Sequence, residues 1–274
     1  MSQTPSDRKQ QRLEVERRIS EHPAYQEYRL GLAFQRSINA VFVQNWRELL
    51  SLLEQASTDP KLALELIQNV RPPVVRDKFQ AVTTQRLHNY VAGTMTLVEH
   101  SRRIMRGRAG QIADDFAKRK IALLRNPEVA FIQDLRNFLL HRALPFFAHS
   151  LSLDKLNTPE QTMTSEVELN VAELLEWDKW SSQSRQYLQS LDEVVVLRPL
   201  IRRHGQLVVG INGWLHDELG HANEEALTEV NRLVVERNAL VMGSDIATAE
   251  EQTKKWSDLR DGNITPQEMF GSST

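Results

Sequence analysis

Helical periodicity of the apolar residues is the feature of this 274-residue sequence that most restricts its fold. Apolar side chains recur every three or four positions in several long segments, and proline or glycine stands near the segment ends. Each such segment predicts a helix with one apolar face, which must be buried against other helices. The segments expected to be helical are about 23–56, 61–69, 75–106, 111–125, and 127 to just before Pro145. Their short connections predict an antiparallel helical bundle.

The period changes from helical to strand-like beyond Pro145. Between residues 163 and 171 apolar and polar side chains alternate, which is typical of a half-buried strand, and a weaker alternation at 148–153 offers an antiparallel partner. We therefore expect a small hairpin at about 147–171, because a single strand is not stable alone. The predicted fold class is mainly α: an antiparallel helical bundle with a small β-hairpin insertion and additional C-terminal helices.

The C-terminal helices are expected between residues 172 and 243. Asn170 with Glu173 resembles a capping pair that starts one helix, and Ser190 with Glu193 resembles another. The second of these helices is expected to end at Gly220, with Pro199 kinking it or redefining its start. A last helix is predicted over about 223–242.

Three parts are expected along the chain. Residues 1–22 are polar and predict a frayed helix or a disordered lead, and residues 23–243 predict a single helical domain. Residues 244–274 are mostly polar and predict a flexible tail.

Composition excludes several classes of site. The chain has no cysteine, so it has no disulfide, thiolate zinc site, iron–sulfur cluster or cysteine nucleophile. Its N-terminal residues lack the apolar core of a signal peptide, and no apolar run approaches the roughly 18 residues needed to cross a bilayer. We therefore expect a cytoplasmic protein. The formal net charge of −2 argues against a generally basic nucleic-acid coat.

The helix expected from Pro127 has the strongest local signals. Asn126 suits the N-cap, Pro127 the first helical position, and Glu128 the positive end of the helix dipole. Its apolar residues occupy one wide face. At 100° per residue, Asn137 and His141 lie one turn apart on the opposite side, within reach of the long Arg136 side chain.

The segment Arg136-Asn137-Phe138-Leu139-Leu140-His141 follows the pattern Arg, then Asn, Asp or His, then three residues, then His. With this motif on a late helix of a bundle, residues 24–150 resemble the HEPN superfamily, whose members are helical bundles and include metal-independent ribonucleases. The resemblance implies RNA binding and endoribonuclease activity. It also implies a homodimer, in which two motifs face a common cleft.

Residue chemistry gives each motif residue an expected role. His141 would exchange a proton with the ribose 2′-hydroxyl or the leaving oxygen. Arg136 would hold the scissile phosphate, and Asn137 would orient the phosphate or the imidazole. The open alternative is a non-catalytic interaction or regulatory protein in which these residues, with Asp134, stabilise the bundle through interhelical hydrogen bonds.

A run of basic residues precedes the motif helix and is a second candidate RNA contact. A positive approach for phosphates would use these residues, although a solvated helical face is the favoured explanation of the run. The arginines expected to contact RNA are Arg102, Arg103, Arg106, Arg108 and Arg119.

No metal site or cofactor site is expected. His216 and His221 resemble a zincin pair, but the second histidine of that motif belongs four residues after the first, at Gly220. Residues 261–268 resemble part of a calcium loop, yet Leu259 stands at a ligand position and cannot bind calcium.

Overall fold

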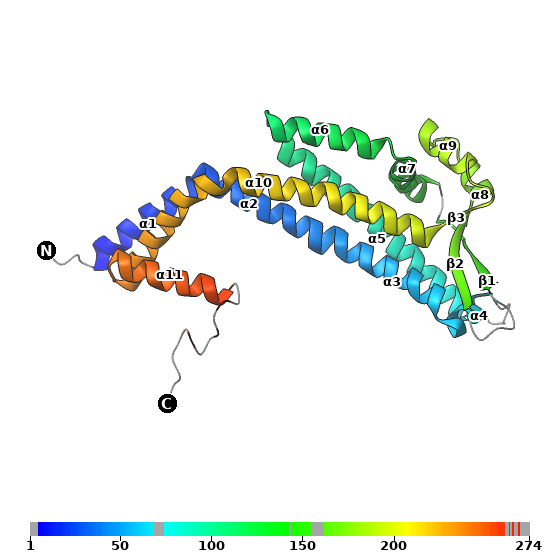
Figure 1. The fold of residues 1–274 in the computed structure, drawn as a ribbon, viewed down its shortest axis with the longest axis horizontal. Coiled ribbons are helices and arrows are strands. Elements are labelled where there is room, and N and C mark those ends of the chain that lie inside the picture. The colour runs from blue at the N-terminus through cyan, green and yellow to red at the C-terminus, as the bar shows by residue number, and fades with distance from the viewer. Residues whose placement is uncertain are drawn as a thin grey trace. The chain divides into compact units, whose positions relative to one another are not determined.

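The structure is a computed structural model that describes residues 5–67, 74–142, 144–154 and 162–260, with the isolated positions 263, 265 and 268. As predicted, the fold is mainly helical with a small antiparallel sheet (Figure 1). The elements in chain order are α1 (Pro5–Glu21), α2 (Pro23–Arg36), the π-helical segment η1 (Ser37–Val43), α3 (Gln44–Thr58), α4 (Pro60–Ile67), α5 (Val74–Met105), α6 (Gln111–Leu124), α7 (Pro127–His141), β1 (Phe147–Asp154), β2 (Thr162–Asn170), α8 (Val171–Leu175), α9 (Ser182–Gln189), β3 (Val194–Val196), α10 (Leu197–Met242) and α11 (Ile246–Arg260).

The chain divides into two compact units, residues 1–32 with 218–274 and residues 33–217. This division differs from the expected lead at 1–22, single domain at 23–243 and tail at 244–274. The segments expected to be a lead and a tail contribute helices α1 and α11 to the first unit. Its boundaries with the second unit fall within α2 and α10, where no proline or glycine-rich linker marks them.

The first unit has a small apolar core of its own. Because α1 contributes only two of its side chains to this core, composition gave little sign of it. The buried core residues are Val15, Ile19, Ala24, Val230 and Leu233.

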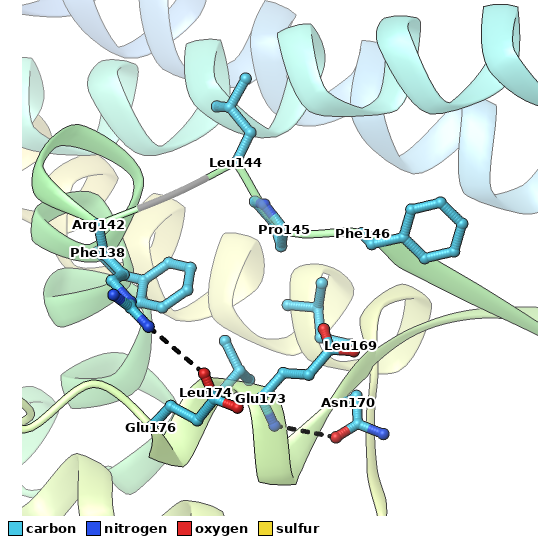
Figure 2. Close-up of a pocket in the computed structure, with 10 residues that line it drawn as sticks. All are labelled: Phe138, Arg142, Leu144, Pro145, Phe146, Leu169, Asn170, Glu173, Leu174 and Glu176. Carbon is cyan, nitrogen blue, oxygen red and sulfur yellow. Dashed lines mark hydrogen bonds and ion pairs between the residues drawn. The ribbon is translucent and has the colours of Figure 1, made fainter.

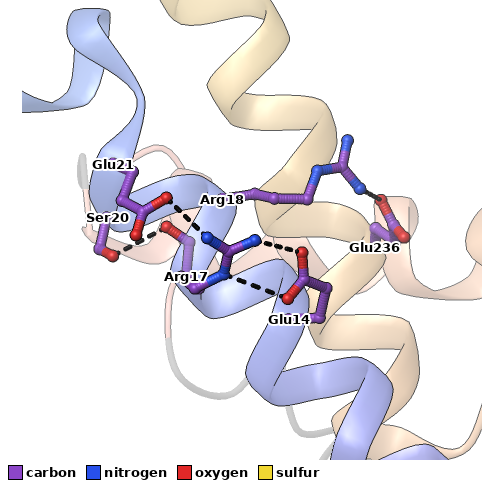
Figure 3. Close-up of polar contacts among 6 residues, drawn as sticks. All are labelled: Glu14, Arg17, Arg18, Ser20, Glu21 and Glu236. Carbon is purple, nitrogen blue, oxygen red and sulfur yellow. Dashed lines mark hydrogen bonds and ion pairs between the residues drawn. The ribbon is translucent and has the colours of Figure 1, made fainter.

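Charged side chains cover the outer face of α1. Arg17 donates to Glu14 at 2.8 Å and to Glu21 at 3.1 Å, and Arg18 reaches Glu236 of α10 at 3.8 Å (Figure 3). All these side chains are largely exposed, so each pair contributes little to stability. Burial of the apolar cluster therefore stabilises the contact of α1 and α2 with α10 more than these ion pairs do.

The second unit is built around α3, α5 and the N-terminal part of α10. Trp46 of α3 donates through Nε1 to the carbonyl of Ile201 in α10 at 2.9 Å. Tyr90 of α5 lies with its ring centroid 5.6 Å from that of Phe42 and 5.7 Å from that of His204 in α10. These contacts fix α10 against both α3 and α5.

The sheet has the order β1-β2-β3, and all its strands are antiparallel. The β1–β2 pairing confirms the predicted hairpin, with Phe147 opposite Leu169, both buried. Helix α3 packs against β2 and α4 against β1, which gives the sheet its covered face (Figure 1).

Strand β3 and the bounds of α10 differ from the prediction. The helix expected from Ser190 begins only at Leu197, because Val194–Val196 pair with β2 instead. Pro199 accordingly stands in the first turn, where a missing amide costs nothing. Gly220 does not end the helix, which continues to Met242 and merges the two helices expected there.

Substitution of Gly205 tests the contact between α3 and α10. A Cβ atom at Gly205 would lie 2.1 Å from Trp46 Cε2, whereas a Cβ at Gly210 on the same helix meets nothing within 4 Å. The Trp46 ring cannot move freely, since its Nε1 is bonded to Ile201. We expect Gly205→Ala to lower the free energy of unfolding by about 1–3 kcal/mol or more. Gly210→Ala should instead raise it by about 0.4–1 kcal/mol. Urea unfolding measures the free energy of unfolding of both variants. An equal change in both would contradict the close contact between Gly205 and Trp46.

His204 is a fully buried histidine in this core. Its Nδ1 lies 2.5 Å from the Tyr90 hydroxyl, and its Nε2 has no hydrogen-bond partner among the residues described. Burial lowers the pKa of His204 to about 4 and raises the pKa of the Tyr90 hydroxyl. The fold therefore accommodates only the neutral imidazole.

Stability should fall in acid because of His204. An exposed histidine has a pKa of 6.5 and folded His204 one of about 4, so the unfolded chain binds more protons between these values. The stabilisation is complete above pH 6.5 and falls by about 3 kcal/mol as the pH decreases to 4. Urea unfolding of the parent and of His204→Gln, which keeps a hydrogen-bonding side chain but does not titrate, isolates this contribution. An identical pH dependence in both proteins would contradict it.

Candidate functional site

The start of α7 is formed as the sequence predicts. The Asn126 side-chain oxygen accepts from the amides of Glu128 at 2.9 Å and Val129 at 3.3 Å, and Pro127 occupies the first turn. The helix ends at His141, before Pro145. The motif therefore occupies the last turns of a well-capped helix.

The apolar face of α7 sets the orientation of the motif. Phe131, Ile132 and Leu135 are fully buried. One turn later Phe138 packs its ring 5.7 Å from Trp177 and 5.5 Å from Trp180. Both tryptophans are buried, as expected of core anchors. With this face fixed, the opposite face of α7 turns to solvent.

Arg136, Asn137 and His141 are all exposed on that opposite face. Arg136 Nη1 donates to Asn137 Oδ1 at 3.4 Å, which is the one polar contact that these three side chains make within the part of the chain that the structure describes. Among the described residues, none of these side chains bonds another helix. Their exposure leaves them accessible to a ligand.

Asp134 stabilises the bundle through hydrogen bonds between helices, the role that was the alternative to catalysis for the motif residues. Its carboxylate accepts from the amide of Ser181 at 2.9 Å and from the hydroxyl of Ser184 at 2.7 Å. These bonds tie α7 to the first turn of α9, which Ser181 caps. Asp134 thus bonds α9, and among the described residues it pairs neither with His141 nor with an arginine.

A small pocket of about 110 Å³ adjoins Arg136. It is lined by Arg136 and Leu140 of α7 and by His88, Val91 and Ala92 of α5. His88 is exposed, and its place beside the motif could not be predicted from local sequence, because only folding brings α5 and α7 together. His141 does not line this pocket.

A larger pocket of about 480 Å³ lies beyond the end of α7, between Leu144–Phe146, the end of β2 and α8 (Figure 2). Arg142 pairs with Glu176 across one end of it at 3.4 Å, and the carboxylate of Glu173 is also part of the lining. Two carboxylates against one arginine disfavour an RNA phosphate here. The acidic side chains thus make this end of the helix unfavourable for an anionic ligand.

Exposed apolar side chains adjoin the motif. Leu140 is 48% exposed, Leu144 63% and Phe146 61%. Leu140 lies within the motif, and the other two follow it in the chain. Leu140 lines the small pocket with Arg136, whereas Leu144 and Phe146 line the larger pocket beyond the end of α7.

The candidate RNA-contacting arginines lie on the last turns of α5, in the turn after it and on α6. Arg102, Arg103, Arg106 and Arg119 are exposed, whereas Arg108 is half-buried and donates to the Ile104 carbonyl at 2.7 Å. The guanidinium of Arg119 lies 4.3 Å from the centre of the Trp214 ring. Arg108 and Arg119 are therefore engaged in contacts within the protein, and fewer of these arginines are available to bind phosphate than the sequence suggested.

Within the described ranges, no group of three or more His, Asp and Glu side chains could hold a metal ion, and His216 and His221 form no such site. The calcium-like segment 261–268 lies mostly outside these ranges. No helix in the same ranges is long and apolar enough to cross a membrane. Comparisons of the chain with protein-family models, curated proteins and solved structures give no match.

Proposed function

We propose that this chain binds RNA and cleaves it without a metal ion, using Arg136, Asn137 and His141. The observation that carries the proposal is the exposure of all three side chains on a helix whose opposite face is fully buried. Residues retained only for packing would be expected to bond other helices, as Asp134 does. The HEPN-like pattern of these residues supports the same function.

The reaction needs no metal because RNA carries its own nucleophile. A base takes the proton of a ribose 2′-hydroxyl, and that oxygen attacks the adjacent phosphorus. The bond to the 5′-oxygen breaks, an acid protonates this oxygen, and the products are a 2′,3′-cyclic phosphate and a 5′-hydroxyl. His141 would serve as one of the two proton-transfer groups. Arg136 would offset charge on the phosphate oxygens, with Asn137 orienting the phosphate.

A second proton-transfer group completes the site. In a homodimer this group would be His141 of the other copy. The exposed apolar residues Leu140, Leu144 and Phe146 support such an assembly, because a two-fold contact through them would bring two motifs close together. His88 is the one other histidine that adjoins the motif among the described residues, through its pocket with Arg136.

Replacement of His141 tests catalysis directly. We expect His141→Ala to slow cleavage of single-stranded RNA by about 10² to 10⁴-fold in the presence of EDTA. Its melting temperature should stay close to that of the parent, because the side chain is exposed and bonds nothing in the described structure. Cleavage is measured on an end-labelled oligonucleotide, whose products should end in a cyclic phosphate.

Two controls accompany this measurement. His221→Ala removes another exposed histidine, on α10, and should leave cleavage unchanged. An oligonucleotide without 2′-hydroxyls should be bound and left intact. RNA binding without cleavage by the parent protein would instead indicate a binding protein, and a large loss of stability in His141→Ala would assign the residue to the fold.

The dimer is tested at Phe146. A carboxylate placed in an apolar contact is costly, so Phe146→Asp should convert a dimer to a monomer, as measured by analytical ultracentrifugation. Ile121→Asp on α6 is the matched control, since Ile121 is 53% exposed and lies away from the motif helix's end. A parent protein that is monomeric at micromolar concentration would contradict the dimer and leave His88 as the second group.

A further inference from the structure

A pocket of about 170 Å³ is lined by α5, α6, α7 and α10 within the second unit. Its volume equals that of roughly six water molecules, well below the 300 Å³ or more of typical drug-sized sites. The pocket therefore suits one ring system. Its apolar lining is formed by Met95, Val98, Phe116, Leu123, Leu124 and Ile211.

Asn212 lines this pocket and has an unused acceptor. The residue is only 6% exposed. Its Nδ2 donates to the carbonyl of Val208 one turn earlier at 2.8 Å, while its Oδ1 accepts no hydrogen bond in the part of the chain that the structure describes. Gln133 of α7 adds a second amide to the lining. An open acceptor in the pocket wall favours a ligand that carries an N–H or O–H donor.

The opening of the pocket is positively charged. Arg102 and Lys120 both line it and are exposed, so they stand at its rim. Arg102 pairs with Glu99 at 2.6 Å, but both side chains are largely exposed, so phosphate could replace this carboxylate at little cost. Lys120 makes no ion pair among the described residues. An anionic group outside the pocket would thus find two cations.

A nucleotide has the three features that this pocket favours: a flat ring, an N–H donor and an anionic group. Its base is a flat ring that gains from aromatic and apolar contact, as Phe116 and its neighbours offer. Base edges carry N–H donors for amide oxygens such as Asn212 Oδ1. The phosphate is the anion for the rim. An alkyl carboxylate would satisfy the lining and the rim, but it would leave the Asn212 acceptor unpaired.

The pocket is also aligned with the motif. Gln133, Asn137 and His141 follow one another at intervals of four residues along α7, which places them on one side of the helix. Gln133 and His141 are about 12 Å apart along the axis, at about 1.5 Å per residue. Single-stranded RNA with one base in the pocket would therefore lead along the motif towards His141.

We propose that this pocket binds one nucleotide, with the base inside it and the phosphate on Arg102 and Lys120. The inference rests on the proposed RNA function where the nucleotide belongs to an RNA strand. A free nucleotide and a nucleotide within RNA both carry a base joined to a sugar phosphate, so the pocket could bind either. Held in this way, the nucleotide would position the strand for cleavage at His141.

Titration calorimetry of the full chain with AMP, CMP, GMP, UMP and ribose 5-phosphate tests the pocket. At least one nucleotide should bind at least about tenfold more tightly than ribose 5-phosphate, because only nucleotides bring a base. Asn212→Leu removes the acceptor at similar size and should lower that preference about tenfold. Equal binding of ribose 5-phosphate and all nucleotides would overturn the proposal.

The rim offers closely matched variants. The double variant Arg102→Gln, Lys120→Gln should weaken nucleotide binding by about tenfold or more. The control is Lys78→Gln, Lys118→Gln, which removes two positive charges from the same two helices at exposed positions that do not line the pocket. If both double variants weaken nucleotide binding equally, the positive charges attract the nucleotide non-specifically, and the assignment of the phosphate to Arg102 and Lys120 is overturned.

A 2′-O-methyl RNA oligonucleotide, which binds but cannot react, distinguishes the two proposals. Binding of this oligonucleotide with the same dependence on Asn212 and Arg102 supports a site for RNA. If RNA is cut in a His141-dependent way while the pocket variants behave as their controls, the pocket proposal fails alone. If AMP or another nucleotide binds through the pocket and RNA is neither bound nor cut, the site is one for free nucleotides and the proposed function fails.

Discussion

Burial of one face of α7 is the constraint on which the candidate site depends. Three side chains of this helix, Phe131, Ile132 and Leu135, are completely enclosed, and each contributes about 1.5–3 kcal/mol relative to exposure. Surface ion pairs elsewhere are worth about 1 kcal/mol or less. The apolar contacts therefore fix the rotation of α7 about its axis. Since residues four apart share a side of the helix, the same rotation turns Asn137 and His141 outwards together.

Local signals in the sequence were sufficient for this helix and for most of the second unit. Asn126 caps α7 through its own side chain, and the breaks at Gly107 and Gly110 have positive φ values that favour glycine. Such features depend on residues close together in the chain. The Ser190–Glu193 pair is a local signal of the same kind, but Val194–Val196 gain more by pairing with β2. Gly220 has open space around it and no need to end the helix.

The parts that the sequence did not predict are those assembled from distant residues. The motif could be found because Arg136 and His141 lie on one helix, and its exposure follows from the apolar period of α7. The pocket at Asn212 could not, because its lining comes from four helices and extends from Met95 to Asn212 in the sequence. His88 and Arg136 likewise meet only across α5 and α7. Helical periodicity predicts which face is buried, and it does not specify the partner.

The two ends of α7 lie beside side chains of opposite charge. Glu173 and Glu176 line the pocket beyond its C-terminal end, whereas Arg102 and Lys120 stand beside Gln133, two turns before His141. A polyanion is attracted at one end and repelled at the other. Because Arg136 and Asn137 lie between these ends, a strand drawn to the cations would cross them before meeting the carboxylates. In the proposed RNA complex, the acidic end would limit how far the strand extends and would place the phosphate nearest His141 at the boundary between the two fields.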